Sequence, residues 1–120
     1  MNSTNNEEPN DCPVRIVQNM IGRKWSIMIL YHLSTRTLRF GELHRLMSNV
    51  TESTLTKELR SLESYKLIIR KVYPQVPPKV EYSFTEIGMK FLPVLEALTI
   101  WNDQYNQYVE NEKVNGGNYE

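Results

Sequence analysis

The chain has 120 residues, the length of one domain, and its 40% hydrophobic and 23% charged residues are typical of a globular protein rather than a disordered one. No stretch approaches the roughly 18 apolar residues of a membrane span, and the polar start lacks the features of a signal peptide, so we expect a cytoplasmic protein with no membrane partner. The single cysteine, Cys12, excludes an internal disulfide framework and a multi-cysteine metal site.

The formal net charge is zero, but the charges are unevenly distributed along the chain. Residues 36–79 carry nine Lys and Arg against four Glu, whereas residues 80–120 carry two Lys against seven Asp and Glu. A basic middle and an acidic C-terminal third suggest two surfaces with different partners, the basic one suited to phosphates. The alternative is a chance fluctuation among solvated side chains.

Order is expected to begin near Cys12. Pro13 suits the first position of a helix, and apolar residues then recur at helical spacing until Gly22 ends it. A second helix over residues 24–34 is apolar on most sides, so we expect it at the centre of the core. Residues 35–39 form a short link with room for one turn of strand.

Apolar residues between positions 40 and 47 indicate a short third helix, and residues 48–50 form a turn. Thr51 is predicted to cap a fourth helix, because a hydroxyl at that position accepts a backbone N–H. The inward residues of the fourth helix are Leu55, Leu59 and Leu62. Two helices joined by so short a turn are typical of a helix-turn-helix.

The period of the pattern then changes from helical to strand-like. Residues 67–73 and 80–84 are rich in β-branched and aromatic side chains, and the loop between them is rich in proline. These features predict a β-hairpin with a stiff, extended tip. Thr85 is predicted to cap a last long helix over residues 86–108.

A basic helix followed directly by a basic hairpin is the order of elements in a winged helix. The second helix of a helix-turn-helix reads base edges in the major groove, and outward hydroxyls, Lys and Arg suit bases or phosphates. Glu52 is negatively charged, unlike the other outward residues. Its carboxylate either accepts a hydrogen bond from a cytosine amine or is stabilised by the positive N-terminal end of the helix dipole. The predicted DNA contacts are Arg39, Ser53, Thr54, Thr56, Lys57 and Arg60 from the helical part and Lys71, Gln75 and Lys79 from the hairpin.

Two alternatives stay open for this surface. Any exposed helix shows Ser, Thr, Lys and Arg outward, so the pattern on the fourth helix is also that of an ordinary solvated face. A winged helix also serves as a protein-interaction module without specific DNA binding.

The last predicted helix carries a heptad pattern of large apolar residues. Its members are Ile87, Phe91, Val94, Leu98, Trp101, Tyr105 and Tyr108. One small core does not use so many, so we predict a homodimer interface that contains Val94, Leu98, Trp101, Tyr105 and Tyr108. Pro93 is expected to kink this helix. The alternative is that the helix folds back on its own chain.

Cys12 lies at the predicted start of the first helix, where the helix dipole favours a thiolate that senses oxidants or electrophiles. The alternative is an unreactive small side chain. The two histidines stand alone: His32 is expected in the core, and His44 at the surface on the DNA side. With no phosphate-binding loop and no metal-ligand spacing, we predict no cofactor, no metal and no catalytic site, so the chain is not expected to be an enzyme.

The sequence resembles the HxlR-type helix-turn-helix regulators. The stretches that carry the resemblance are CPV at 12–14, IGRKWS at 21–26, LRFGEL at 38–43, LTKELR at 55–60 and RKVYPQVPPKVEYSFT at 70–85. The resemblance implies a MarR-like winged-helix dimer that binds promoter DNA, usually as a repressor. It also implies an oxidant sensor, since several members of the family sense oxidants through a cysteine in the position of Cys12.

This sequence departs from the family pattern at two places. The recognition helix of the family often opens with Gly-Ile-Ser, whereas residues 49–51 are Asn-Val-Thr, so the operator cannot be copied from a relative. The family often has Glu-Asp-Gly-Leu at the end of that helix, whereas residues 63–67 are Glu-Ser-Tyr-Lys-Leu. The missing glycine puts the helix C-cap geometry in question.

The expected fold class is α+β and mostly helical, a winged helix-turn-helix with a C-terminal dimerisation helix. The domain is expected over residues 12–109, between a disordered tail at 1–11 and a flexible tail at 110–120. The expected function is a transcriptional regulator that binds a near-palindromic operator in double-stranded DNA as a homodimer, with an oxidant as effector. A small-molecule effector between the first, second and last helices is a further alternative, but no polar anchor names a ligand.

Overall fold

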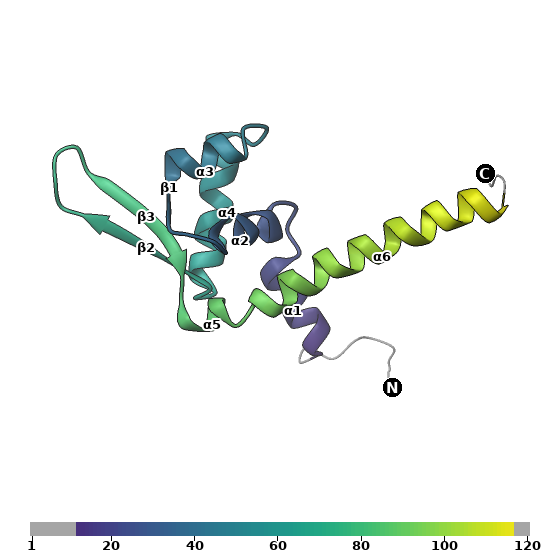
Figure 1. The fold of residues 1–120 in the computed structure, drawn as a ribbon. Helices are drawn as coiled ribbons and strands as arrows, with labels where there is room; N and C mark the ends of the chain where they lie inside the picture. The colour runs from purple at the N-terminus through teal and green to yellow at the C-terminus, as the bar shows by residue number, and fades with distance from the viewer. Residues whose placement is uncertain (1–11, 117–120) are drawn as a thin grey trace. The chain divides into compact units, whose positions relative to one another are not determined.

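The computed structural model describes residues 12–116, with side chains through residue 114 (Figure 1). The expectation of a disordered segment at 1–11 lies outside the described residues. The chain divides into two compact units, the first ending at Met89 and the second beginning at Lys90. No helix within residues 12–116 is long and apolar enough to cross a membrane.

The first unit opens with two helices, α1 (Pro13–Ile21) and α2 (Ser26–Leu33). Pro13 is the first residue of α1 and Gly22 follows its last, as predicted. The prediction for α2 is half right, because Ile29, Leu30 and Leu33 are buried but Ile27 and Met28 are 38% and 45% exposed. One face of α2 lies in the core, and the opposite face is left open.

A helix-turn-helix follows, made of β1 (Leu38–Arg39), α3 (Phe40–Leu46) and α4 (Glu52–Ser64). Thr51 caps α4 as predicted, with its Oγ1 accepting the N–H of Thr54 at 3.1 Å. His44 was expected at the surface, but it is half-buried and its Nε2 lies 2.8 Å from the carbonyl oxygen of Val50. This bond ties α3 to the turn before α4 and requires the proton on Nε2.

The hairpin consists of β2 (Ile68–Tyr73) and β3 (Lys79–Phe84). The sheet is antiparallel in the order β1-β3-β2, with Leu38 and Arg70 both in register with Tyr82. Its base is anchored in the core, because Ile68 and Tyr82 are buried. The tip projects beyond the helices of this unit (Figure 1).

The end of α4 resolves the question of the missing glycine. Lys66 takes the positive φ of 67° that glycine usually adopts after a helix. The N–H of Leu67 donates to the carbonyl of Leu62 at 3.1 Å, and that of Lys66 donates to Glu63 at 2.9 Å. The helix therefore ends in a Schellman-type turn even though the glycine is absent.

A short helix, α5 (Glu86–Met89), closes the first unit. Thr85 caps it: its Oγ1 accepts the N–H of Gly88 at 3.0 Å and donates to the carbonyl of Lys66 at 2.6 Å. Gly88 lies directly against the carbonyl of Leu67, where a Cβ would overlap the oxygen. This close contact explains why the position is a glycine.

The second unit contains α6 (Leu92–Gly116). The prediction of one helix over 86–108 with a kink at Pro93 is wrong, since α5 ends at Met89 and a new helix begins at Leu92. Pro93 lies in the first turn of α6, where a missing N–H costs no hydrogen bond. The helix also continues through residues 110–116, which were expected to fray.

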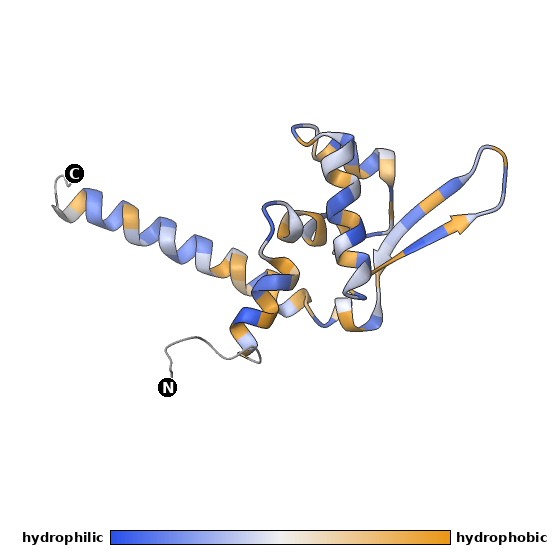
Figure 2. Cartoon of the chain, turned by 180° about the vertical axis from the view of Figure 1, so that it is seen from behind, coloured by the Kyte–Doolittle hydropathy of each residue, from blue (hydrophilic) through white to orange (hydrophobic). Residues whose placement is uncertain are grey.

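The break shortens the predicted heptad seam. Ile87 belongs to α5 and Phe91 precedes α6, so neither continues the apolar face of the long helix. The seam on α6 begins at Val94 and ends at Tyr108. Figure 2 shows hydrophobic and hydrophilic residues alternating along this helix.

Candidate nucleic-acid interface

The recognition helix α4 has one buried side and one exposed side. Leu55, Leu59 and Leu62 are fully buried, as predicted. On the opposite side Ser53, Lys57 and Arg60 are exposed at intervals of four and three residues, which places them in one row along the helix. These three predicted contacts therefore share one solvent-facing surface.

The two threonines predicted as contacts lie on the flanks of this row. Thr54 and Thr56 are both half-buried. Successive residues of a helix are 100° apart, so these two lie on opposite sides of α4, and the side of Thr56 is the one toward the hairpin. The structure therefore separates Thr54 from Thr56.

Arg39 stands at the start of α3 with an exposed side chain. Its backbone N–H donates to Glu42 Oε1 at 2.8 Å, which fixes the beginning of α3. Glu42 also lies 3.9 Å from the guanidinium of Arg36.

The two faces of the hairpin carry different charges. Side chains alternate along a strand, so Arg70 lies on the face of Ile68 and Tyr82, toward α4. Lys71 and Lys79 lie on the other face, with their ammonium groups 4.9 Å and 4.6 Å from the ring centre of Tyr73. The two predicted lysines are thus brought together, but on the side away from α4.

A carboxylate completes this lysine face. Glu81 accepts a hydrogen bond from the hydroxyl of Tyr73 at 3.0 Å and pairs with Lys79 at 3.3 Å. The bond from Tyr73, aided by the charge of Lys79, holds the pKa of the Glu81 carboxyl below its ordinary value. Lys79 is therefore partly engaged within the protein, whereas Lys71 has no ion pair among the described side chains.

The tip of the hairpin is open to solvent. Gln75 is exposed, as a contact residue must be, and so is Val76 beside it. The bond between Val76 and Pro77 is cis.

An open groove of about 480 Å³ runs between α4 and the hairpin. Residues of both elements line it, so the helix and the hairpin lie side by side, which is the arrangement that the DNA-binding prediction requires. The lining residues are Phe40, Glu52, Thr56, Arg60, Glu63, Arg70, Val80 and Tyr82.

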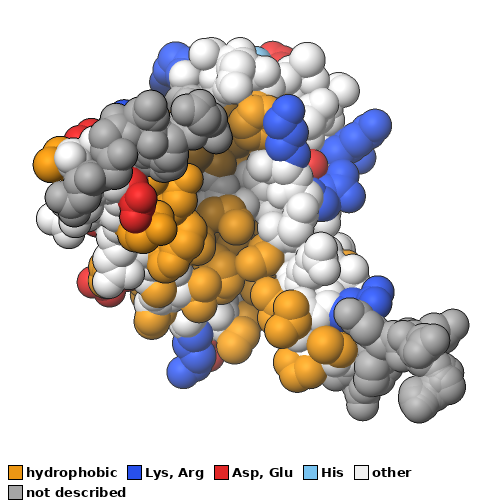
Figure 3. Space-filling model, turned by 90° about the vertical axis from the view of Figure 1, so that its right-hand side faces the viewer, with side chains coloured by type: hydrophobic (Ala, Val, Ile, Leu, Met, Phe, Trp, Pro, Cys, Tyr) orange, Lys and Arg blue, Asp and Glu red, His pale blue; other side chains and the backbone are white. Residues whose placement is uncertain are grey.

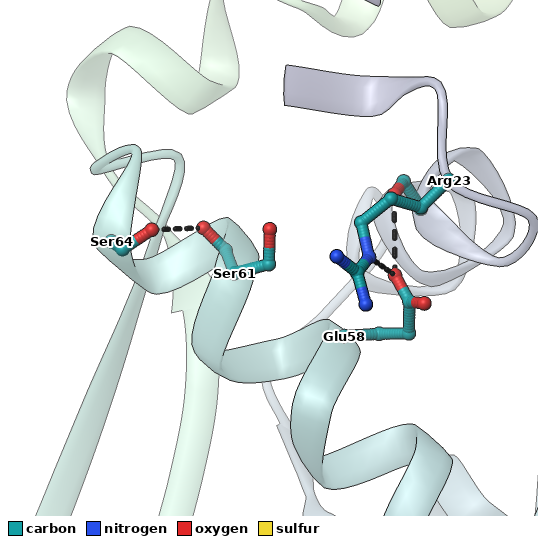
Figure 4. Close-up of polar contacts among 5 residues, drawn as sticks. Arg23, Glu58, Ser61 and Ser64 are labelled. Atoms are coloured by element: carbon teal, nitrogen blue, oxygen red, sulfur yellow. Dashed lines mark hydrogen bonds and ion pairs between the residues drawn. The ribbon is translucent and has the colours of Figure 1, made fainter. Parts of the chain in front are cut away.

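Sequence reasoning missed two charged residues of this region. Arg70 was passed over for its neighbour Lys71, although its spacing of two from Ile68 places it on the face toward α4. Glu58 is buried on the apolar side of α4, where it accepts from Arg23 Nε at 3.0 Å and Ser26 Oγ at 3.5 Å (Figure 4). Glu58 lies three residues after Leu55 and four before Leu62. This helical spacing places it on the same buried face and could have identified it from the sequence.

Each unit exposes apolar side chains. The five predicted interface residues of α6 are 43–62% exposed, and Trp101 stacks on Tyr105 with ring centres 5.5 Å apart. In the first unit, Val14, Val17, Met28 and Tyr31 of α1 and α2 are exposed as well. Figure 3 shows exposed hydrophobic side chains in orange.

Cys12 is the N-cap residue of α1, as predicted, and its side chain is half-buried. Its carbonyl oxygen accepts the N–H of Ile16 at 3.0 Å, which begins the helical ladder. His32 is half-buried on α2, and burial lowers the pKa of its ring below the ordinary value. The core position predicted for His32 is therefore only partly met, and the direction of the shift favours the neutral ring.

Comparisons with known proteins give one consistent result. The family model of the HxlR-like helix-turn-helix matches residues 20–110. The chain is 45% identical over 100 residues to an HTH-type transcriptional regulator of Methanothermobacter thermautotrophicus, covering 83% of this chain and 76% of the relative.

Two solved structures extend the comparison. The redox regulator HypR in its oxidised form matches with a TM-score of 0.73 and 40% identity, covering 78% of this chain and 96% of HypR. The reduced form of the transcriptional regulator YodB from B. subtilis matches with a TM-score of 0.70 and 28% identity, covering 78% and 93%.

Proposed function

Because the chain belongs to the family of HxlR-like helix-turn-helix transcriptional regulators, we propose that it binds double-stranded DNA through α4 and the β2–β3 hairpin. The observation that carries this proposal is the shared groove, since it places Arg60, the last member of the exposed row of α4, beside the hairpin. Ser53 and Lys57, in the N-terminal half of α4, are positioned to read base edges. Arg39, Gln75 and Lys71 lie at the periphery and contact the backbone.

The protein acts as a homodimer. The apolar face of α6 supports this part of the proposal, because large exposed patches of this kind mark interaction surfaces. A two-fold dimer presents two copies of α4, so its operator is a near-palindrome with half-sites about 34–36 Å apart. A dimer bound to its operator blocks transcription from that site. We therefore expect the protein to act as a repressor.

Cys12 responds to oxidants. Two neighbours of similar fold, HypR and YodB, were solved in defined redox forms, and HypR is described as a redox regulator. Each subunit has one thiol, that of Cys12. A thiol oxidant such as diamide takes two electrons and two protons from a pair of thiols. The pair forms one disulfide bond, either between the Cys12 residues of two subunits or between Cys12 and a small external thiol.

The DNA-binding proposal is tested by selecting duplexes from a random pool and measuring their affinity for the protein at several salt concentrations. We expect enrichment of a near-palindrome, and binding that weakens steeply with salt as counterions are released. A Lys57→Ala variant loses part of the affinity, and the matched variant Lys113→Ala on α6 does not. A protein-interaction module would enrich no sequence, and that result would overturn the proposal.

The redox proposal is tested on the same operator. We expect treatment with diamide to change the affinity of the wild-type protein and to leave a Cys12→Ser variant unaffected. Full modification of Cys12 with undiminished operator affinity would contradict a sensing role and leave the DNA-binding proposal intact.

A further inference from the structure

Two arginines from different elements line the same groove. Arg60 belongs to α4 and Arg70 to β2, and both side chains are exposed. Within the described residues, no carboxylate oxygen lies within 4.0 Å of either guanidinium, although Glu52 and Glu63 line the groove as well. Both cations are therefore available to a ligand.

The shape of the groove indicates what that ligand is. One wall is a face of α4 and the other is a strand face with Val80 and Tyr82. In a duplex, each sugar–phosphate strand is the ridge that separates a major groove from a minor groove. In the proposed complex α4 occupies a major groove, and the hairpin lies beside α4 across an open groove. The ridge that bounds the major groove on that side then lies between the two walls.

We propose that this groove holds one sugar–phosphate strand of the bound duplex, and that Arg60 and Arg70 bind its phosphates from opposite walls. The inference rests on the proposed DNA-binding function and assigns a role to Arg70 that sequence reasoning did not give it. A guanidinium suits a phosphate because its planar donors match two oxygens at once. Arg60 then contributes to binding of any sequence and does not read a base.

The two carboxylates of the groove have the opposite effect. Glu52 and Glu63 lie on the same wall as Arg60, and each repels a phosphate held between the walls. This repulsion limits non-specific affinity. Removing either charge is therefore expected to tighten binding to every duplex alike.

The test compares the selected operator with a scrambled duplex of the same length across a range of salt. For Arg70→Gln and Arg60→Gln we expect both affinities to fall by the same factor, on the order of tenfold for a charge-assisted contact. The slope of log affinity against log salt should fall by about one in each variant. Arg70→Lys, which keeps the charge, should retain most of the slope.

Glu63→Gln provides the opposite arm of the test. It should tighten binding to both duplexes severalfold, and this gain cannot come from misfolding. The matched control is Arg36→Gln, whose exposed guanidinium pairs with Glu42 outside the groove and whose loss should leave both affinities unchanged.

Three outcomes would overturn the inference. If Arg70→Gln binds both duplexes like the wild type, the groove does not hold the backbone, and the DNA-binding proposal survives. If Arg70→Gln loses affinity for the operator alone, Arg70 reads a base instead. If the wild-type protein retains no duplex, both proposals fail together.

Discussion

Lys66 adopts a backbone conformation that usually belongs to glycine. Its φ of 67° brings the Cβ close to the following carbonyl, which costs an L-residue roughly 1–2 kcal/mol. Glycine avoids this cost but gives up about 0.5–1 kcal/mol of unfolded-state entropy. We therefore expect Lys66→Gly to stabilise the fold by about 0.5–1 kcal/mol, measured from urea unfolding.

The matched control for Lys66 is two residues away. Ser64 is exposed in the last turn of α4 and keeps helical geometry. Ser64→Gly should destabilise the protein by about 0.5–1 kcal/mol, because glycine weakens a helix. Equal losses in the two variants would show that the turn after α4 does not favour glycine.

Glu58 is buried, and its carboxylate pairs with Arg23, which is 48% exposed at its side chain. Removing Arg23 leaves the carboxylate without its charged partner. We expect Arg23→Gln to lower the free energy of unfolding by about 1–2 kcal/mol, less than for a fully buried pair because solvent screens the arginine.

A double-mutant cycle separates this coupling from other effects. In a Glu58→Gln background, Arg23→Gln should cost much less, since no buried charge remains to be paired. The control is Arg36→Gln, whose pair with Glu42 is exposed and should contribute at most about 0.5 kcal/mol. A cost for Arg23→Gln that is the same in both backgrounds would remove Glu58 as the reason.

At the scale of elements, local chemistry was enough to predict most boundaries. Pro13 and Thr51 start helices because of what their own atoms can bond, and these predictions are confirmed. The break between α5 and α6 was not predicted, because no local signal in the sequence marks it. The heptad pattern runs through it without interruption, and Pro93 suits either a kinked interior or a first turn.

What decides the break is tertiary contact. Gly88 packs on the carbonyl of Leu67, and Thr85 bonds the backbone of Lys66, so α5 is fixed by residues distant in sequence. The same limit applies to the site. The row of Ser53, Lys57 and Arg60 follows from helical spacing alone, whereas the neighbours of Arg70 become apparent only once the hairpin is placed beside α4.

At the scale of the whole molecule, the exposed apolar face of α6 is the feature that supports the proposed dimer. An isolated helix gains little stability from its own backbone, and most helices are held by packing of an apolar face. On α6 that face carries Trp101, Tyr105 and three further large residues, whereas the opposite side carries Glu96, Asp103 and Glu110. Such a division matches a helix with one side against a second subunit.

We therefore expect sedimentation equilibrium to give twice the chain mass of 14.1 kDa. Leu98→Glu places a charge in the middle of the seam, where burial without a partner is costly, and should shift the protein to monomer at micromolar concentration. Because Leu98 is 43% exposed within one chain, the monomer should keep its helical content. Gln107→Glu, on the polar side of α6, is the matched control and should remain dimeric.

The monomeric variant should lose affinity for the full palindrome yet bind a single half-site as weakly as the wild type does, because only the coupling between two α4 helices is removed. A Leu98→Glu protein that stays dimeric would place the subunit contact elsewhere than on this face.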